Sequence, residues 1–158
     1  MGTKKPSAIA KILRNSGKTL SVAESCTGGL LGQQITSIPG SSEYFLGGII
    51  AYGDRIKIDR LGVSKVSLKK FGAVSQTVAK EMAQNVRRLF KTDYGISTTG
   101  IAGPGGATKN KPVGLVYIAV SAPKKVICKK FQFRGGRNAV RSQASHQAIN
   151  LLLQKIST

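Results

Sequence analysis

Apolar residues recur at helical spacing in some segments of this chain and alternate with polar residues in others, which predicts a mixture of helices and strands. Ile9, Ile12 and Leu13 mark the first helix, which Gly17 ends, and Ser75 is a favourable N-cap for a later one. The patterns predict helices over about 6–16, 26–38, 57–61, 66–71, 76–91 and 137–156, and strands over about 19–23, 44–52, 93–99, 113–121 and 126–133.

The order of these elements predicts an α/β domain. Helices separate the first three strands, which favours parallel pairing and a sheet with helices on both faces. The turn at Pro123-Lys124-Lys125 is short enough to join the last two strands as an antiparallel hairpin. A length of 158 residues corresponds to one domain, 1–158. We therefore expect a single domain with a mostly parallel, mixed five-stranded sheet.

The chain is strongly basic, with 25 Lys and Arg residues against 6 Asp and Glu residues and a formal net charge of +19. This balance argues against a metal site rich in carboxylates. It indicates an anionic partner, for which a nucleic acid, a membrane surface and a phosphorylated small molecule are the three classes to weigh.

The remaining composition narrows the class of protein further. Cys26 and Cys128 are too few for a disulfide framework, and with the single His146 they cannot complete a four-ligand zinc site without carboxylates. No apolar run reaches the roughly 18–20 residues that a membrane span needs, and no apolar signal-peptide segment follows the basic start of the chain. We expect a cytoplasmic protein with no metal, no other cofactor and no membrane partner.

The segment AESCTGG, residues 23–29, is the first candidate for chemistry. It joins a predicted strand to a predicted helix, so its side chains lie at the sheet edge where open α/β folds bind ligands. Free amides at the helix start could stabilise an oxyanion beside a Ser25 nucleophile. Cys26 competes for that role, since a thiol at a helix N-terminus can have a lowered pKa.

A base for such a nucleophile has to be found among the lysines. His146 falls on the polar face of the last helix, which makes a Ser-His-Asp triad improbable. Lys57 follows the strand that ends near Tyr52, and burial or the nearby cations Arg55 and Arg60 could lower its pKa. A second candidate segment, the glycine-rich run at 99–106, would let backbone amides approach a phosphate or a ribose.

Together these segments resemble the CinA carboxy-terminal domain family, which contains the nicotinamide-mononucleotide deamidases. The resemblance covers nearly the whole chain. It rests on AESCTGG (23–29), PGSS-x-x-F-x-GG (39–48), the pair Tyr52 and Lys57, GAVS (72–75), TGIAGPGG (99–106) and KPVG (111–114), which occur in the family's order and spacing.

The resemblance implies a three-layer α/β/α sandwich and the hydrolysis of a nucleotide carboxamide by a metal-free Ser–Lys pair. The pair maps onto Ser25 and Lys57, with Tyr52 and Thr99 orienting it or the amide, and Arg137 reaching the phosphate. The other residues expected around the substrate are Thr27, Gly28, Gly29, Gly100, Gly103 and Gly105. The expected partners are a phosphorylated pyridine nucleotide and further copies of the chain as a homo-oligomer. In many members this domain follows a larger one, whereas here we expect it to stand alone.

The chain departs from the family pattern after Tyr52, where Gly53-Asp54 replaces the usual Ser-Asn. An aspartate there could pair with Lys57 and raise the pKa of its amine, which would oppose its work as a base. The acidic residue that often follows Pro104 is also missing. Two alternatives to the amidohydrolase therefore stay open: a basic nucleic-acid-associated protein related to competence or damage, and a catalytically silent family member.

Overall fold

A computed structural model describes residues 4–157, so residues 1–3 and 158 of the expected single domain lie outside the described residues. The helices are α1 (Lys4–Ser16), α2 (Leu30–Thr36), α3 (Asp54–Asp59), α4 (Lys65–Phe71), α5 (Gln76–Phe90) and α6 (Arg137–Ile156), with a short 3₁₀ turn, η1, at Ser41–Glu43. The strands are β1 (Leu20–Glu24), β2 (Phe45–Ile50), β3 (Tyr94–Gly100), β4 (Leu115–Ala122) and β5 (Lys125–Gln132).

The five strands of the described residues form one mixed sheet in the order β2-β1-β3-β4-β5. β1 runs parallel to both of its neighbours, β2 and β3. β4 runs antiparallel to β3 and to β5, so β4 alone is reversed within this sheet. The hairpin between β4 and β5 and the mostly parallel direction of the strands are both confirmed.

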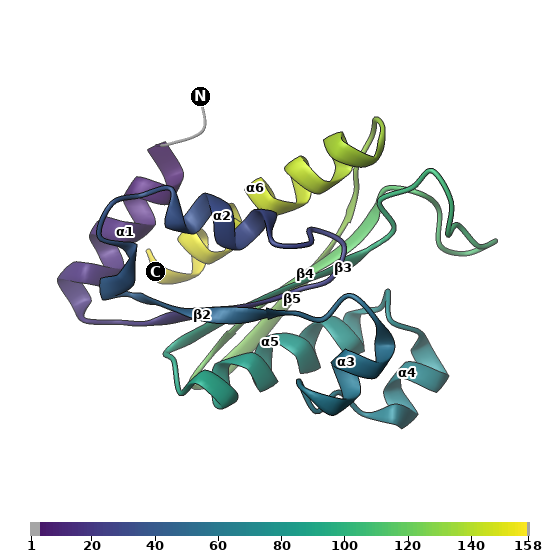
Figure 1. The fold of residues 1–158 in the computed structure, drawn as a ribbon, viewed down its shortest axis with the longest axis horizontal. Helices are drawn as coiled ribbons and strands as arrows, with labels where there is room; N and C mark the ends of the chain where they lie inside the picture. Colours follow the sequence, from purple (N-terminus) through teal and green to yellow (C-terminus); the bar gives the residue numbers. More distant parts are fainter. Residues whose placement is uncertain (1–3, 158) are drawn as a thin grey trace.

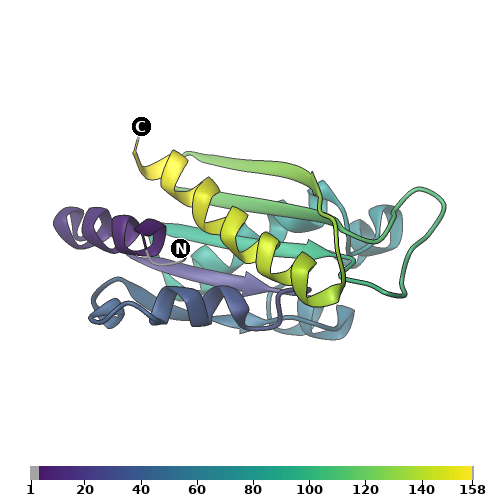
Figure 2. The ribbon, with the colours of Figure 1, turned by 90° about the horizontal axis from the view of Figure 1, so that it is seen from above.

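Helices cover both faces of the sheet, which gives the three layers of an α/β/α sandwich (Figures 1 and 2). α1, α2 and α6 lie on one face, where their apolar stripes pack with the sheet into the larger core. α5 lies on the opposite face, where Val78, Met82 and Val86 pack against Ala23 and Ala51. The amphipathic patterns of α1, α5 and α6 thus place their apolar sides on the sheet.

The structure differs from the sequence-based prediction at the start of the second helix, which was expected at residue 26. α2 begins at Leu30, and residues 26–29 form a turn. Gly28 and Gly29 adopt φ angles of 57° and 102°, a left-handed backbone that cannot continue a helix. The strand expected over 44–52 is also shorter, since the chain leaves the sheet after Ile50.

The parallel strands β2, β1 and β3 end at the same edge of the sheet, and the segments that follow them meet there. α2, which follows β1, lies on one face of the sheet, and α5, which follows β2, lies on the other. The connections that leave this edge therefore run to opposite faces of the sheet. Open α/β sheets bind ligands in the crevice at such a point. None of the helices in the described part of the chain is long and apolar enough to cross a membrane.

Candidate active site

Ser25 and Lys57 lie in direct contact at this edge of the sheet. Ser25 is the first residue after β1, and Lys57 lies in α3, which follows β2. Lys57 Nζ is 3.1 Å from Ser25 Oγ. Lys57 is 1% exposed and Ser25 8%, so the sequence-predicted pair is brought together with little of either residue exposed to solvent.

Two backbone carbonyls hold the amine of Lys57 in place. Lys57 Nζ donates to the carbonyl oxygens of Ala51 at 2.8 Å and Tyr52 at 3.1 Å. A neutral amine has two N–H bonds and one lone pair. With both N–H bonds on these carbonyls, the lone pair is left for the hydroxyl proton of Ser25. The carbonyls were not recognised from the sequence, since any residue type supplies one.

Burial lowers the pKa of Lys57 below its ordinary value, because the low-dielectric interior disfavours the ammonium form. The expectation that Asp54 raises this pKa is also met, since Asp54 Oδ1 lies 3.8 Å from Lys57 Nζ. Asp54 is largely exposed, and the effect of burial exceeds that of its charge. Lys57 therefore keeps a lowered pKa despite the aspartate.

The two arginines expected to lower the pKa of Lys57 do not act on it. Arg55 Nε instead donates to Asp59, 3.3 Å away, and both side chains point to solvent. Arg60 is exposed at the end of α3. Burial, and not neighbouring positive charge, is the cause of the shift.

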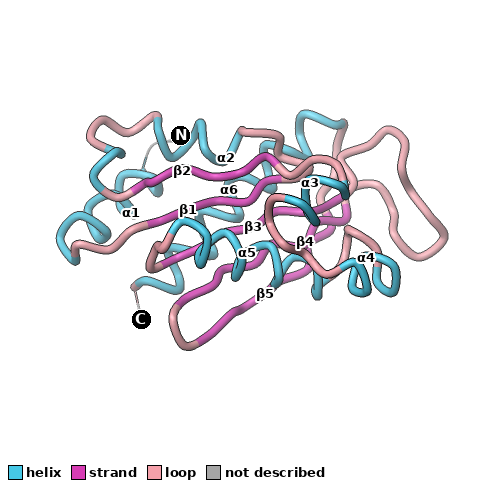
Figure 3. Tube along the Cα trace, turned by 60° about the horizontal axis from the view of Figure 1, so that its bottom comes forward, coloured by secondary structure: helices cyan, strands magenta, loops and turns pink. Residues whose placement is uncertain are grey.

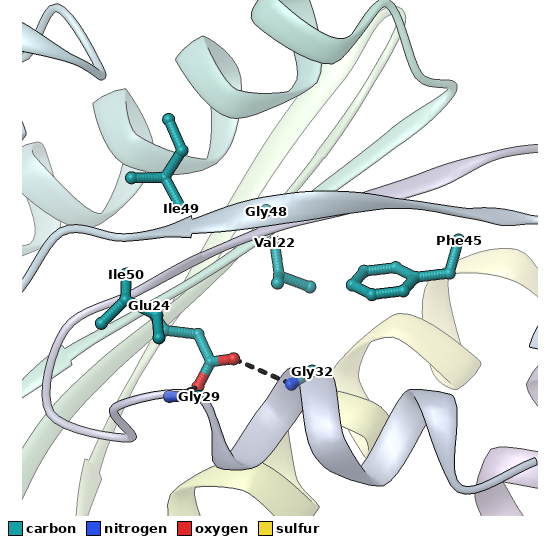
Figure 4. A pocket seen from close by; sticks show the side chains of 8 residues that line it. All are labelled: Val22, Glu24, Gly29, Gly32, Phe45, Gly48, Ile49 and Ile50. Atoms are coloured by element: carbon teal, nitrogen blue, oxygen red, sulfur yellow. Dashed lines mark hydrogen bonds between the residues drawn. The ribbon is translucent and has the colours of Figure 1, made fainter. Parts of the chain in front are cut away.

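A buried carboxylate, Glu24, occupies the start of α2, as Figure 4 shows. It accepts hydrogen bonds from the amides of Gly29 at 3.0 Å, Leu31 at 3.1 Å and Gly32 at 2.8 Å. The Thr27 hydroxyl donates to it at 2.6 Å. An acid at the end of a fully buried strand, followed by threonine and glycines, was the sequence signal for this cap, and it was missed.

The prediction that the amides of Gly28 and Gly29 in AESCTGG are free to stabilise an oxyanion is wrong. The amide of Gly29 is taken by Glu24, and the amide of Gly28 donates to the carbonyl oxygen of Ser25 at 3.1 Å. Neither amide is free to hold an oxyanion. Among the described residues, the amides of Cys26 and Thr27 have no such acceptor in another residue, which leaves them as the candidate donors in this turn.

The same geometry separates Ser25 from Cys26 as nucleophile. Burial raises the pKa of the Cys26 thiol to about 12, so the thiol keeps its proton at neutral pH. The lowered pKa that a helix N-terminus would provide is absent, because α2 begins four residues later and Glu24 takes its amides. Lys57 contacts the serine hydroxyl, so this geometry favours Ser25 over Cys26 as the candidate nucleophile.

A cleft of about 210 Å³ opens over the pair. Its walls come from the ends of β1 and β3, from α3, from the segment before α5 and from the start of α6. They consist of Ser25, Cys26, Tyr52, Asp54, Lys57, Ala73, Val74, Thr99, Gly100, Ala102 and Arg137. The Thr99 hydroxyl donates to the carbonyl oxygen of Ala73 at 2.8 Å. The Thr99 hydroxyl thus joins two walls of the cleft.

Arg137 lies at the rim of the cleft, as its place at the start of the last helix predicts. One guanidinium nitrogen donates to the Tyr52 hydroxyl at 2.7 Å and another to the Gly103 carbonyl at 2.8 Å. A guanidinium has five N–H donors, so three remain for a ligand. Gly103 therefore acts by orienting Arg137. Gly105 is exposed and does not line the cleft, contrary to its predicted place at the substrate.

Comparison with known proteins identifies the fold and the family. The family model of the CinA C-terminal domain matches residues 3–156. A CinA-like protein of Gloeothece citriformis is 52% identical over 155 residues, which cover 96% of this chain and 37% of that protein. The chain thus spans little more than a third of this relative's length.

Solved structures agree with this match. The competence/damage inducible protein CihA from Agrobacterium tumefaciens has 34% sequence identity and a TM-score of 0.95, with 99% of this chain and 95% of that chain covered. A CinA superfamily protein from Enterobacter cloacae has 29% identity and a TM-score of 0.95, with 99% and 92% covered. The expected α/β/α fold is confirmed.

Proposed function

The chain belongs to the CinA C-terminal domain family, and from this membership and the cleft geometry we propose that it hydrolyses the carboxamide of nicotinamide mononucleotide. The products are nicotinate mononucleotide and ammonia. The observation that carries the proposal is the contact of 3.1 Å between Lys57 Nζ and Ser25 Oγ inside a buried site. A serine paired with a neutral lysine is a base-activated nucleophile suited to acyl transfer.

The first half of the reaction forms an acyl-enzyme. Neutral Lys57 takes the proton of Ser25 while Oγ attacks the carboxamide carbon, and the carbonyl oxygen becomes an oxyanion. The amides of Cys26 and Thr27, which no backbone carbonyl takes, would stabilise that charge. The Lys57 ammonium then protonates the departing nitrogen, the C–N bond breaks, and ammonia leaves an ester on Ser25.

The second half releases the acid. Lys57, neutral again, takes a proton from a water molecule, whose oxygen attacks the ester carbon. The Ser25–carbon bond breaks, and the proton held by Lys57 returns to Ser25 Oγ. The carbonyls of Ala51 and Tyr52 hold the amine through both halves, so no reorganisation of Lys57 is needed between them.

Recognition of the nucleotide falls to the rim of the cleft. Arg137 presents unused N–H donors there, and the Tyr52 hydroxyl and the Gly103 carbonyl fix its orientation. A guanidinium held in this way suits two oxygens of one phosphate. Gly100 lines the same cleft and leaves space for the ribose.

The test is the stoichiometry of the reaction. The protein is incubated with nicotinamide mononucleotide in the presence of EDTA, and ammonia and nicotinate mononucleotide are measured together. We expect the two products in a ratio of one to one. Binding of the nucleotide without turnover would instead indicate a catalytically silent family member.

A further inference from the structure

A second hollow lies far from the catalytic cleft, where the last turns of α5 meet the turn between β4 and β5. It has a volume of about 240 Å³. Its lining residues are Gln84, Arg87, Arg88, Ser121, Ala122, Pro123, Lys124, Lys125 and Val126. Figure 3 shows this turn at the end of the sheet opposite to α3 and α4.

The distance between the two sites follows from the register of β3. Gly95, near the start of β3, pairs with Ser121 beside the hollow, and Gly100 at its end lines the cleft. A strand rises about 3.3 Å per residue, so the hollow and the cleft are on the order of 15–20 Å apart. A ligand in the hollow cannot touch Ser25 or Lys57.

Four cationic side chains, Arg87, Arg88, Lys124 and Lys125, surround this hollow, and no carboxylate lines it. All six carboxylate side chains of the chain are engaged elsewhere. Glu24 binds backbone amides, Glu81 binds Ser64 and Ser67, and the other four pair as Glu43 with Arg14, Asp54 with Lys57, Asp59 with Arg55 and Asp93 with Lys18.

Within the described part of the chain, the four cations have no counter-ion. Over residues 4–157, no hydrogen bond or ion pair joins any of them to another side chain. Arg87 is half-buried, and its Nε is enclosed without an acceptor. Like charges held around one concave surface repel one another, and the hollow concentrates their potential. A ligand with several negative charges would offset the repulsion between the cations and be attracted by their combined positive potential.

We propose that this hollow binds a compact polyphosphate group, that is, two or more adjacent phosphates on a small molecule. Two guanidinium forks and two ammonium groups supply donors for more oxygens than a single phosphate offers. The enclosed shape favours a compact group over the backbone of a polymer, which would need a continuous basic track. This site is separate from the proposed deamidase cleft, and the proposal holds whether or not that activity is found.

The test is a calorimetric titration with tripolyphosphate at about 0.1 M salt. We compare the wild-type chain with the double variants Arg87→Gln/Lys124→Gln and Lys124→Gln/Lys125→Gln. The second pair is exposed, with Lys124 in the turn and Lys125 at the first position of β5, so its substitution should leave the fold intact. Each variant removes two charged contacts worth at least about tenfold each, so we expect the dissociation constant to rise by about a hundredfold or more.

Two control variants locate the effect. Lys5→Gln/Lys11→Gln removes the same charge from exposed positions of α1, on the other face of the sheet, and Arg137→Ala removes the cation of the cleft. The α1 variant should bind tripolyphosphate as the wild type does, and Arg137→Ala should keep the binding that the hollow variants lose. Equal weakening by the α1 variant would show a general effect of net charge, and loss of all binding in Arg137→Ala would place the anion in the cleft. Either result overturns the proposal.

A third arm distinguishes the kind of ligand. A single-stranded oligodeoxynucleotide is titrated against the same set of variants. Tighter binding of this polymer than of tripolyphosphate, lost in both hollow variants, would replace the compact ligand with a nucleic-acid backbone. The absence of measurable tripolyphosphate binding to the wild type would also contradict the proposal.

Discussion

Lys57 Nζ lies 3.1 Å from Ser25 Oγ, although the two residues are 32 positions apart in the chain. Parallel pairing of β1 with β2 brings them together, since Ser25 follows one strand and α3 follows the other. Lys57 is buried, whereas the carboxylate of Asp54 beside it is largely exposed to solvent. Burial therefore lowers the pKa of the Lys57 amine, which loses its proton more readily than an exposed lysine does.

The first test concerns Lys57 as the base. Because only the neutral amine can take the Ser25 proton, activity should rise with pH until it levels off above the lowered pKa of Lys57. Lys57→Met should lower kcat by several orders of magnitude with little change in nucleotide affinity. Lys57→Arg should also fail, because a guanidinium stays charged at neutral pH. An active arginine variant would reject the mechanism.

A second test uses Asp54, whose carboxylate lies 3.8 Å from Lys57 Nζ and raises the pKa of that amine. Asp54→Asn removes a charge that stabilises the ammonium form, so the pKa of Lys57 falls further. The rising limb of the pH–rate profile should move to lower pH, and activity below the limb should increase. Asp59→Asn is the matched control, since Asp59 pairs with exposed Arg55. A limb that moves equally in both variants would rule out a local effect on Lys57.

The third test concerns Arg137 and the phosphate. A charge-assisted contact is worth roughly 1.5–3 kcal/mol, so Arg137→Ala should raise KM for the mononucleotide by about tenfold to a hundredfold. The effect should be much smaller for nicotinamide riboside, which lacks the phosphate. Steady-state kinetics with both compounds measure the difference. An equal rise in KM for both would assign Arg137 a role in holding Tyr52 or Gly103 rather than in binding phosphate.

The control for Arg137 is a variant with glutamine at four lysines in and beside the β4–β5 turn: Lys124, Lys125, Lys129 and Lys130. All four lysines are exposed and lie on the edge strand β5 or in its turn, so solvent ions screen their charges. Their removal should change kcat/KM little at physiological salt. A loss as large as that of Arg137→Ala would make the basic surface part of the substrate site.

The fourth test concerns stability. Glu24 is buried and accepts three amide hydrogen bonds at the start of α2. Glu24→Gln replaces an acceptor oxygen with an NH₂ donor facing those amides, so unfolding should become easier by about 1–3 kcal/mol. Glu43→Gln breaks only an exposed pair with Arg14 and should cost less than about 1 kcal/mol. Chemical denaturation of the two variants gives the comparison, and equal losses would contradict the buried role of Glu24.

Hydrophobic periodicity predicted the fold well where each element buries one clear face. The stripes of α5 and α6 and the alternation in the strands gave the right elements to within a few residues. The prediction was wrong at residues 26–29, where apolar spacing extended the helix into a turn. That turn depends on a left-handed backbone and on a carboxylate from another element. Neither feature changes the spacing of apolar residues, so hydrophobic periodicity could not predict the turn.

The site was predictable only in part. Motif resemblance pointed to Ser25, Lys57 and Arg137, which the fold brings to one cleft. The carbonyls that hold Lys57, the amides consumed by Glu24 and the bond from Thr99 to Ala73 depend on tertiary geometry. The substrate roles and the expected homo-oligomer stay predictions.

The most direct measurement compares Ser25→Ala with Cys26→Ser in the release of ammonia from nicotinamide mononucleotide, with EDTA present. Ser25 contacts Lys57, whereas burial holds the Cys26 thiol in its protonated form. Ser25→Ala should lose several orders of magnitude in kcat while keeping its fold, and Cys26→Ser should keep most of the wild-type rate. An inactive Cys26→Ser variant beside an active Ser25→Ala variant would contradict the assignment of Ser25 as the nucleophile.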